Sequence, residues 1–142
     1  MMTIVDTDVL FGITDPRDSL YRRTQATLSF FAQHNADFML LPTTLGEFVS
    51  LSTIKLGRSE TQAAVSEILR SGYLPVDLPA TMVQDAAKIY FQQTSKEESL
   101  FDCYVMAAAK QYKADCIFSF DRGYIKNGFV IAEDFVARKK WL

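Results

Sequence analysis

The sequence predicts an α/β fold in which a mostly parallel sheet of about five strands lies between two layers of helices. Short apolar runs alternate along the chain with longer segments of helical character, the order typical of strand–helix–strand units. The 142 residues are 49% hydrophobic and 23% charged, and they contain no repeat, low-complexity tract or Pro/Gly/Ser-rich linker. We therefore expect one domain that spans residues 1–142.

Five short runs are predicted to be strands because each is apolar and is bounded by turn or breaker residues. The first run ends in the acid Asp6, and the second stops at Pro42. The third contains Pro75, which excludes it from the centre of a sheet, since proline has no N–H to donate. The predicted strands cover residues 3–6, 38–41, 73–76, 116–120 and 129–131.

Helical segments are predicted between and after these strands from their capping signals. Asp15 and Pro16 suit the N-cap and the first position of a helix that runs to about residue 35. Thr44 and Glu47 form a capping-box pattern at the start of the next helix. The predicted helices cover residues 16–35, 44–57, 59–72, 81–94, 99–112 and 134–140, and the second and third of them form a helical hairpin.

Composition excludes several classes of enzyme. The single histidine, His34, rules out two-histidine nuclease sites and histidine-rich zinc sites. The glycine motifs of dinucleotide-binding proteins, P-loop proteins and serine hydrolases are absent. Cys103 and Cys116 lack CxxC spacing and are expected to be buried, reduced thiols.

Charge and hydropathy limit the cellular setting and the partners. The formal net charge is −2 and the pI about 5.3, so nucleic-acid binding would depend on a local basic patch. No apolar run has the length of a membrane span, and the N-terminus lacks the basic stretch of a signal peptide. We expect a cytoplasmic protein with no membrane partner.

Four acids stand where a purely structural role is unexpected. Asp6 and Asp121 each end a predicted strand, and the carboxyl ends of strands face the ligand crevice of an open α/β sheet. Asp102 lies in an otherwise apolar helix, where an ionised carboxylate is costly unless it is paired or binds a metal. Glu47 lies on a partly apolar helix face. Together they are candidates for one carboxylate site.

Each of these acids also has a structural interpretation. Asp102 is placed to cap its helix together with Ser99, and Glu47 is placed to form a capping box with Thr44. Asp121 suits a turn. If the four converge instead, their mutual repulsion would be relieved by a divalent cation, and an all-oxygen ligand set favours Mg²⁺ or Mn²⁺ over zinc.

Five pieces of the chain occur in the order found in a known family. They are residues 4–10 (IVDTDVL), Glu47, residues 101–109 (FDCYVMAAA), residues 118–122 (FSFDR) and residues 130–135 (VIAEDF). On these residues the chain resembles the PIN-domain family, and within it the small toxin ribonucleases of the VapC type. The resemblance implies a three-layer α/β/α PIN-like fold.

The resemblance also implies an activity and a site. The implied site is an acidic quartet that holds Mg²⁺ or Mn²⁺, made of Asp6, Glu47, Asp102 and Asp121, with Thr7 in support through a hydrogen bond. Asp8 departs from the family, which more often has Asn or Ser there, and its role as a ligand or a solvated neighbour stays open. The implied reaction is hydrolysis of RNA by a metal-activated water, with transfer or ribosomal RNA as the substrate class. The implied partners are a small antitoxin and a second copy of the chain in a homodimer.

Basic residues on the rim of such a site would bind the RNA backbone. The candidates are Arg122, Lys126, Lys55 and Arg58, with Arg22, Arg23, Lys96 and residues 138–140 as further basic positions. Arg122 is the best placed of them because it follows Asp121. Trp141 is expected to pack on the body of the protein.

Two other functions are weighed against this one. A catalytically silent PIN-fold binding module would be indicated by the loss of one of the four acids, and all four are present. The pair Asp6 and Asp8 resembles the start of haloacid-dehalogenase phosphatases, in which the first acid is a nucleophile. Leu10, however, stands where those enzymes usually have Thr or Val, and a phosphatase would leave Glu47 and Asp102 unexplained.

Overall fold

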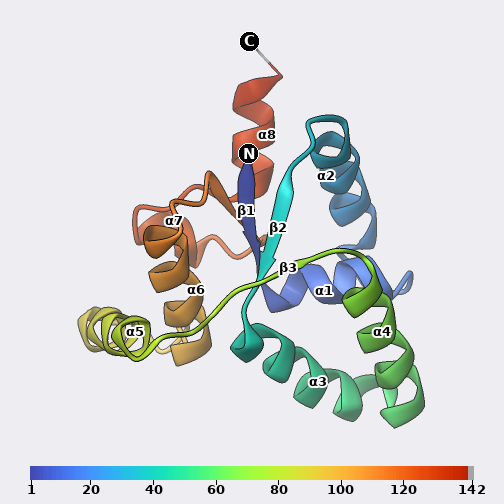
Figure 1. Cartoon of the computed structure of the whole chain (residues 1–142), viewed down its shortest axis with the longest axis horizontal. Coiled ribbons are helices and arrows are strands. Elements are labelled where there is room, and N and C mark those ends of the chain that lie inside the picture. The colour runs from blue at the N-terminus through green and yellow to red at the C-terminus, as the bar shows by residue number, and fades with distance from the viewer. Residues whose placement is uncertain (141–142) are drawn as a thin grey trace.

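A parallel sheet of four strands forms the centre of the protein (Figure 1). The computed structural model describes residues 1–140, so Trp141 lies outside the described residues. The strands are β1 (Met2–Val5), β2 (Asp37–Leu40), β3 (Leu74–Pro75) and β4 (Cys116–Phe118), in the order β3-β2-β1-β4. All three neighbouring pairs are parallel, and β3 lies at an edge, as its proline predicts.

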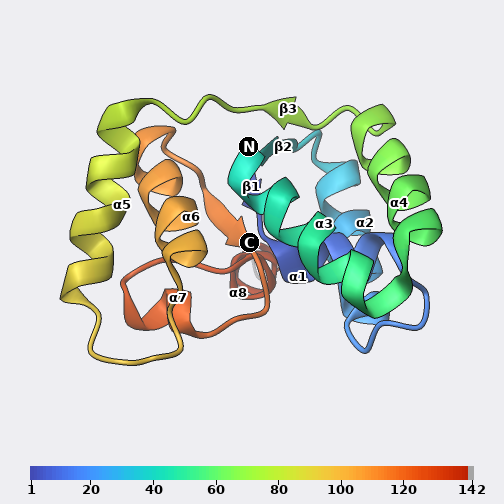
Figure 2. The ribbon, with the colours of Figure 1, turned by 90° about the horizontal axis from the view of Figure 1, so that it is seen from below.

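Helices cover both faces of this sheet, which confirms the predicted α/β/α layers. Figure 2 shows α5 and α6 on one side and α1 to α4 on the other. Helix α7 packs with α5 and α6, whereas α8 packs against α2 and β4. The helices are α1 (Thr7–Thr14), α2 (Tyr21–Gln33), α3 (Pro42–Leu56), α4 (Arg58–Arg70), α5 (Ala80–Gln92), α6 (Leu100–Gln111), α7 (Gly123–Lys126) and α8 (Ala132–Lys139).

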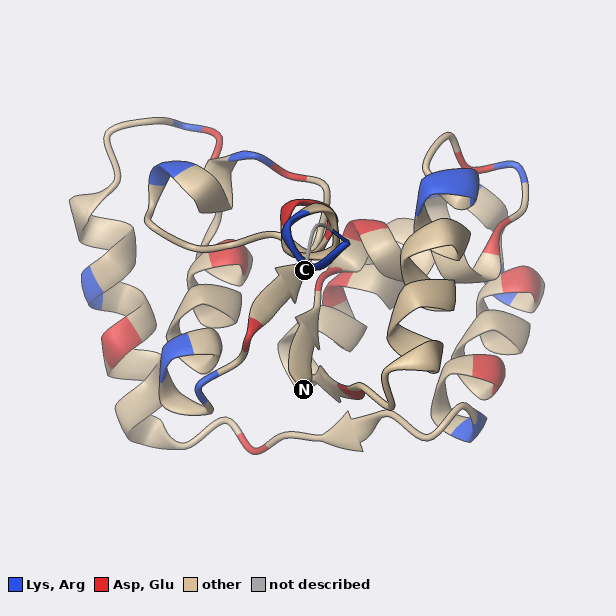
Figure 3. Cartoon of the chain, turned by 90° about the horizontal axis from the view of Figure 1, so that it is seen from above, with Lys and Arg blue, Asp and Glu red and all other residues tan. Residues whose placement is uncertain are grey.

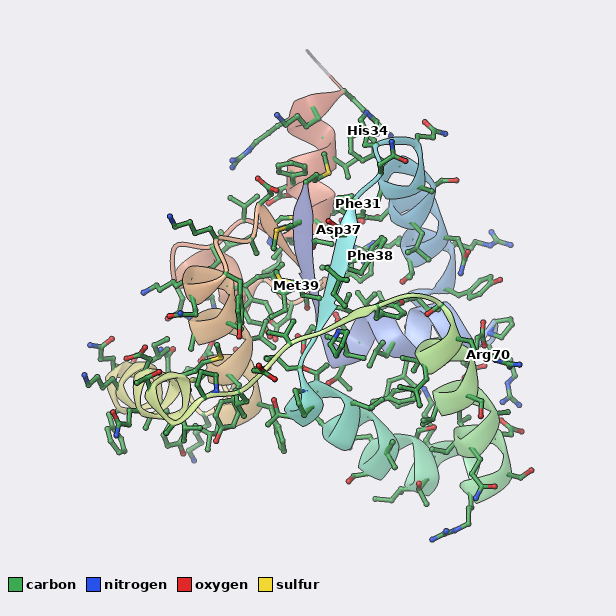
Figure 4. All side chains as sticks on the ribbon, in the orientation of Figure 1. Phe31, His34, Asp37, Phe38, Met39 and Arg70 are labelled. Atoms are coloured by element: carbon green, nitrogen blue, oxygen red, sulfur yellow. The ribbon has the colours of Figure 1, made fainter. Side chains whose placement is uncertain are left out.

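The pleat of the sheet divides the core into two clusters. In β2, Phe38 points toward α2 and Met39 toward the opposite face (Figure 4). The ring of Phe31 on α2 packs edge-on against Phe38 at 5.8 Å and against Phe118 of β4 at 5.4 Å. Aromatic contacts therefore fix α2 on the sheet beside β4.

The order of the strands produces a switch point between β1 and β4. The connection from β1 to β2 runs through α1 and α2 on one face, and the connection from β3 to β4 runs through α5 and α6 on the other. Chain segments leaving the carboxyl ends of β1 and β4 therefore separate, and ligands of open α/β sheets bind in the crevice formed at such a point.

The strand count differs from the expected five. Residues 129–131 contribute only an isolated parallel bridge between Ile117 and Ile131. Strand β4 ends at Phe118 rather than at residue 120, because the backbone N–H of Ser119 turns back to the Ile117 carbonyl and that of Phe120 donates to Asp8. Hydrogen bonds to a side chain thus replace the end of the ladder.

The helix starts also differ from the prediction. Helix α1 was not predicted, because Val9, Leu10 and Phe11 are all buried and give no amphipathic pattern. Asp15 is the C-cap of α1 rather than the N-cap of the next helix, which begins at Tyr21.

Four further helices begin earlier than predicted, among them α4 at Arg58 and α8 at Ala132. Helix α3 begins at Pro42, with Leu41 as N-cap, so Thr44 and Glu47 form no capping box there. Helix α5 begins at Ala80, one residue before Thr81. No helix formed by residues 1–140 combines the length and the apolar character needed to cross a membrane.

Helix α1 approaches α2 closely at Gly12. A Cβ atom on Gly12 would lie 2.1 Å from the Oγ1 atom of Thr24, a buried hydroxyl with no hydrogen-bond partner within residues 1–140. A side chain at position 12 would therefore push the two helices apart, and α1 carries Asp6 at its N-cap.

We expect Gly12→Ala to lower the free energy of unfolding by about 1–3 kcal/mol, the usual cost of overpacking. The double variant Gly12→Ala/Thr24→Ala should recover only part of that loss, as measured by urea unfolding, because Cβ of residue 24 remains 2.9 Å from the new Cβ. Gly46→Ala is the matched control. A Cβ on Gly46 meets nothing within 4 Å, so alanine should stabilise helix α3 by roughly 0.5–1 kcal/mol. Equal effects at positions 12 and 46 would contradict the close approach.

Candidate functional site

Asp6 is placed at the switch point by the end of β1 and the start of α1. Its backbone N–H donates to the Phe118 carbonyl at 3.0 Å, which continues the pairing of β1 with β4. Its Oδ1 atom caps α1 by accepting the Thr7 N–H at 2.8 Å. The residue is 6% exposed, so a carboxylate is buried where the two strands separate.

Asp102 reaches the same place from α6. It forms a capping box with Ser99: Oδ2 accepts the Ser99 N–H at 2.8 Å, and the Ser99 hydroxyl accepts the Asp102 N–H at 3.2 Å. The structural interpretation of Asp102 is therefore correct, and it uses only one carboxylate oxygen. The other oxygen, Oδ1, accepts a hydrogen bond from the Tyr124 hydroxyl at 3.3 Å.

Tyr124 joins the two acids. Its hydroxyl also lies 2.6 Å from Oδ2 of Asp6, and the side chain is only 2% exposed. Burial, followed by the charges of Asp6 and Asp102, raises the pKa of Tyr124 well above its ordinary value. The hydroxyl thus keeps its proton and acts as a donor between two carboxylates.

Glu47 comes from α3 and is half buried. Its Oε1 atom accepts a hydrogen bond from the hydroxyl of Thr7, the residue expected to support the site. This contact, in place of the capping box with Thr44, turns Glu47 toward the start of α1.

Asp121 and Asp8 meet around Ser119. Oδ2 of Asp8 accepts from the Ser119 hydroxyl at 3.0 Å and from the Phe120 N–H at 2.8 Å. The Ser119 hydroxyl in turn accepts the Asp121 N–H at 3.1 Å. Asp121 also forms the expected turn, since its Oδ1 accepts the Gly123 N–H at 2.8 Å. Asp8 is thus part of the cluster, tied to the segment that carries Asp121.

The carboxylates raise one another's pKa values. Burial, reinforced by the charge of Asp8, raises the pKa of Asp6 from 3.8 to about 7. Burial also raises the pKa of Asp8 to about 6, with a contribution from Asp121. The pKa values of Asp102 and Glu47 are raised for the same first reason, burial. Within residues 1–140, no hydrogen bond or ion pair joins a lysine or arginine to any of these acids.

The donor set is suited to a hard divalent cation. Every available ligand atom is oxygen, and Oδ1 of Asp8 is buried without a hydrogen-bond partner among the described residues. As they stand, no three Asp, Glu, His or Cys side chains of residues 1–140 are arranged to hold a metal ion. The chemistry of the residues fits Mg²⁺ or Mn²⁺, and binding would require the carboxylates to draw together.

Comparison with known protein families identifies the family of this chain. A model of the PIN domain matches residues 3–130. The chain belongs to the PIN-domain family. PIN domains are nucleases as a family and generally use divalent metals such as Mg²⁺. This membership removes the basis for the phosphatase alternative, which rested on the spacing of Asp6 and Asp8 alone.

Three solved structures share the PIN fold with this chain. The first is VapC20 of Mycobacterium tuberculosis, which is described as a sarcin–ricin loop cleaving toxin. It is 18% identical to this chain, with a TM-score of 0.79, and the match covers 92% of this chain and 97% of VapC20. FitAcB from Neisseria gonorrhoeae has 22% identity and a TM-score of 0.60, over 92% and 96%. VapBC2 from Rickettsia felis, bound to a DNA fragment from its promoter, has 15% identity and a TM-score of 0.67, over 92% and 97%. No curated protein sequence matched the chain.

Only two of the four basic residues expected to bind RNA lie close to the acids. Arg122 and Lys126 are exposed near Asp121, on the segment that leads into α7 and on α7 itself. Lys55 instead lies 3.5 Å from Oδ2 of Asp18, and Arg58 begins α4. Figure 3 shows acidic positions gathered where the strands end, with basic positions mainly on the surrounding helices and loops.

Three residues near the acids were not predicted from the sequence. Tyr124 and Ser119 are ordinary residues of an apolar segment until the fold brings them against Asp6 and Asp8. Glu98 is buried beside Asp121, since a Cβ on Gly123 would lie 2.9 Å from Oε1 of Glu98 and 3.1 Å from Oδ1 of Asp121. Glycine at position 123 leaves the room that these two carboxylates occupy.

The raised pKa of Asp6 predicts how the stability of the metal-free PIN domain depends on pH. The folded state binds the Asp6 proton more tightly than the unfolded chain does. Protonation of Asp6 therefore stabilises the fold fully below pH 4, and this stabilisation is lost as pH rises through about 7. The melting temperature in EDTA should therefore fall over this window. Asp6→Asn, which keeps an oxygen for the Thr7 N–H, should flatten the profile, whereas Asp37→Asn at an exposed position should not. A melting temperature that rises with pH would contradict this prediction.

Proposed function

We propose that this PIN domain, residues 1–142, is a metal-dependent endoribonuclease that hydrolyses RNA phosphodiester bonds, with Asp6, Glu47, Asp102 and Asp121 as its acidic quartet. One observation carries the proposal. Carboxylates from four separate parts of the chain lie near the ends of β1 and β4 without basic partners; the Tyr124 hydroxyl lies between Asp6 and Asp102, and the Thr7 hydroxyl donates to Glu47. A stable fold has no need of such a group, because buried like charges repel.

The cation supplies the chemistry that these residues lack. A bound Mg²⁺ or Mn²⁺ lowers the pKa of water toward neutrality and compensates charge on the phosphoryl oxygens. The quartet would hold the ion, and Asp8, with one free buried oxygen, is available as a further ligand. No histidine general base is required, which suits a chain whose only histidine, His34, stacks on Phe30.

The side chains of this PIN domain orient the quartet. Tyr124 donates to Asp6 and Asp102, and Thr7 donates to Glu47. Ser119 connects Asp8 to the backbone of Asp121. Each of these bonds occupies one lone pair of a carboxylate oxygen and leaves the others available for a cation. Hydrogen bonds to ligands of this kind orient metal sites in proteins.

The cellular role proposed here is that of a toxin in a toxin–antitoxin pair. The support is the VapC-like order of motifs together with the PIN fold shared with VapC20 and VapBC2. We accordingly propose a small antitoxin and a second copy of this chain as partners, and transfer or ribosomal RNA as substrate. The alternative, a catalytically silent binding module, retains the fold without the chemistry.

The first test is metal-dependent cleavage. We expect discrete cuts in a folded transfer RNA, or in an RNA that carries the sarcin–ricin loop, with Mn²⁺ or Mg²⁺ and none with EDTA. Asp6→Asn should lower the rate on the order of 100-fold or more, because a carboxamide does not replace a charged ligand. Asp85→Asn on α5 is the control for loss of one acid and should cleave normally. Absence of both cleavage and Mn²⁺ binding by calorimetry would favour the silent module.

Two variants of Asp102 distinguish its role as a helix cap from its proposed role in catalysis. Asp102→Asn keeps an oxygen for the Ser99 N–H, so cleavage should be lost while the metal-free melting temperature is unchanged or higher, since repulsion is relieved. Asp102→Ala removes the cap as well and should cost about 0.3–1.5 kcal/mol of stability. If Asp102→Asn lowered the metal-free melting temperature by as much as Asp102→Ala and still cleaved RNA, Asp102 would be only a cap.

A further inference from the structure

An ion pair links α2 to α8 beside the carboxylate cluster. The Nε and Nη2 atoms of Arg23 donate to Oε2 and Oε1 of Glu133 at 2.9 and 2.6 Å, so that the fork of the guanidinium is filled by both oxygens. The guanidinium also lies over the ring of Phe120, 4.5 Å from its centroid. Arg23 is thus held in one orientation by a carboxylate and an aromatic face.

Phe120 connects this pair to the proposed active site. Its backbone N–H donates to Oδ2 of Asp8 at 2.8 Å, and Asp121 is the next residue. The hydrogen bond with Glu133 raises the pKa of Arg23, and the charge of Asp8 acts in the same direction. Arg23 is therefore a cation oriented at the edge of the carboxylate cluster, whereas the side chains of Arg122 and Lys126 enter no hydrogen bond or ion pair among residues 1–140.

The pair lies in a groove between the two helices. The groove has a volume of about 470 Å³ and its lining is mostly apolar, with Ala26, Val136 and Ala137 beside the charged groups of Arg23, Glu133 and Lys140. Figure 3 shows basic positions at the C-terminal end of α8. A strand of nucleic acid that leaves the acidic cluster past Phe120 would meet these groups next.

Exposure limits the stability that the pair contributes. The side chains of Arg23 and Glu133 are 51% and 40% exposed, and pairs this open to water contribute about 0–1 kcal/mol, with bidentate pairs at the upper end. A carboxylate, however, offers the guanidinium fork two oxygens in the way that a phosphate does. Glu133 therefore fills, in the free protein, the position that a phosphate group would take.

We propose that the groove between α2 and α8 binds the RNA backbone next to the cleavage site, with Arg23 exchanging Glu133 for a phosphate. This inference rests on the proposed function, because it names the surface by which that site holds its substrate. RNA is favoured over an acidic peptide because the groove begins at Phe120, which is bonded to the carboxylate cluster, and an aromatic ring under the guanidinium can also stack on a base.

The two residues of the pair are expected to act in opposite directions. Removal of Arg23 takes away the phosphate ligand, and removal of the Glu133 charge takes away its competitor. A latch between α2 and α8 would respond in the same way to either change, because both break the same bonds. The sign of the Glu133 effect therefore separates the proposal from a structural role.

The test measures binding of a short fluorescein-labelled single-stranded RNA by fluorescence anisotropy, in Mn²⁺ and on the Asp6→Asn background. Arg23→Ala should weaken binding on the order of 10-fold, as expected for loss of a charge-assisted hydrogen bond. The slope of log affinity against log salt concentration should fall by the amount expected for about one phosphate contact. Arg23→Lys should recover only part, since an ammonium group does not form the fork. Glu133→Gln should strengthen binding by roughly 3-fold or more, a change of about 0.6 kcal/mol.

Two variants serve as matched controls. Arg70→Ala removes an exposed arginine from the end of α4, and Asp134→Asn removes an acid next to Glu133 on α8. Each should change the affinity by less than about 2-fold, as expected for charges that are largely screened. With catalytic Asp6 restored, Arg23→Ala should raise KM and leave kcat close to that of the unaltered chain.

The possible outcomes are distinct. The groove proposal is overturned if Arg23→Ala and Glu133→Gln weaken RNA binding equally, or if neither changes it. It is also overturned if the chain binds no RNA. If the unaltered chain fails to cleave any RNA with Mn²⁺, the proposed function fails, and opposite signs for the two variants would still establish the groove as an RNA site. Melting curves of every variant test for misfolding. If Arg23→Ala does not fold, Arg23→Lys and Glu133→Gln are compared instead, and they are enough to show whether the two positions act in opposite directions.

Discussion

The hydroxyl of Tyr124 is the contact on which the arrangement of the acids depends. It lies at hydrogen-bond distance from Asp6 at the end of β1 and from Asp102 at the start of α6, two carboxylates that would otherwise face each other across a buried space. Because burial keeps the hydroxyl protonated, one donor serves both acids. Their approach in turn sets the position of α6 relative to the sheet, and with it one wall of the crevice between β1 and β4.

The acids have structural and chemical roles at the same time. Asp6 caps α1 and Asp102 caps α6, so each places a negative charge at the positive end of a helix. This favourable interaction offsets part of the cost of burial and of the repulsion from Asp8, which together raise the pKa of Asp6 to about 7. The capping interpretation of Asp102 and its interpretation as a site residue are therefore compatible, because the two carboxylate oxygens make different contacts. A divalent cation would relieve the remaining repulsion without displacing either cap.

The fold class and the placing of Asp6 and Asp121 at one edge of the sheet could be predicted because they depend on local patterns. Alternation of apolar runs predicts the parallel sheet, and Asp6 and Asp121 each follow a predicted strand. Helix α1 escaped prediction because a fully buried helix has no polar face. The fifth strand was wrong because residues 129–131 form only an isolated bridge to Ile117, and β4 was predicted too long because Ser119 and Phe120 bond to Asp8. Tyr124, Ser119 and Glu98 could not be assigned, since their roles arise only from contacts across the fold.

The basic side chains follow the same distinction between sequence and space. Nearness in sequence favoured Arg122, yet the guanidinium that the structure orients is that of Arg23, which lies far from Asp121 in the chain and reaches its neighbour Phe120 through the packing of α2 against α8. A chain with net charge −2 and a cluster of carboxylates at its centre repels a polyanion at long range. Attraction must then come from a few oriented cations close to the cluster. An arginine already paired with a carboxylate meets that need at little cost, because the bonds it gives up to Glu133 are replaced by equivalent bonds to a phosphate.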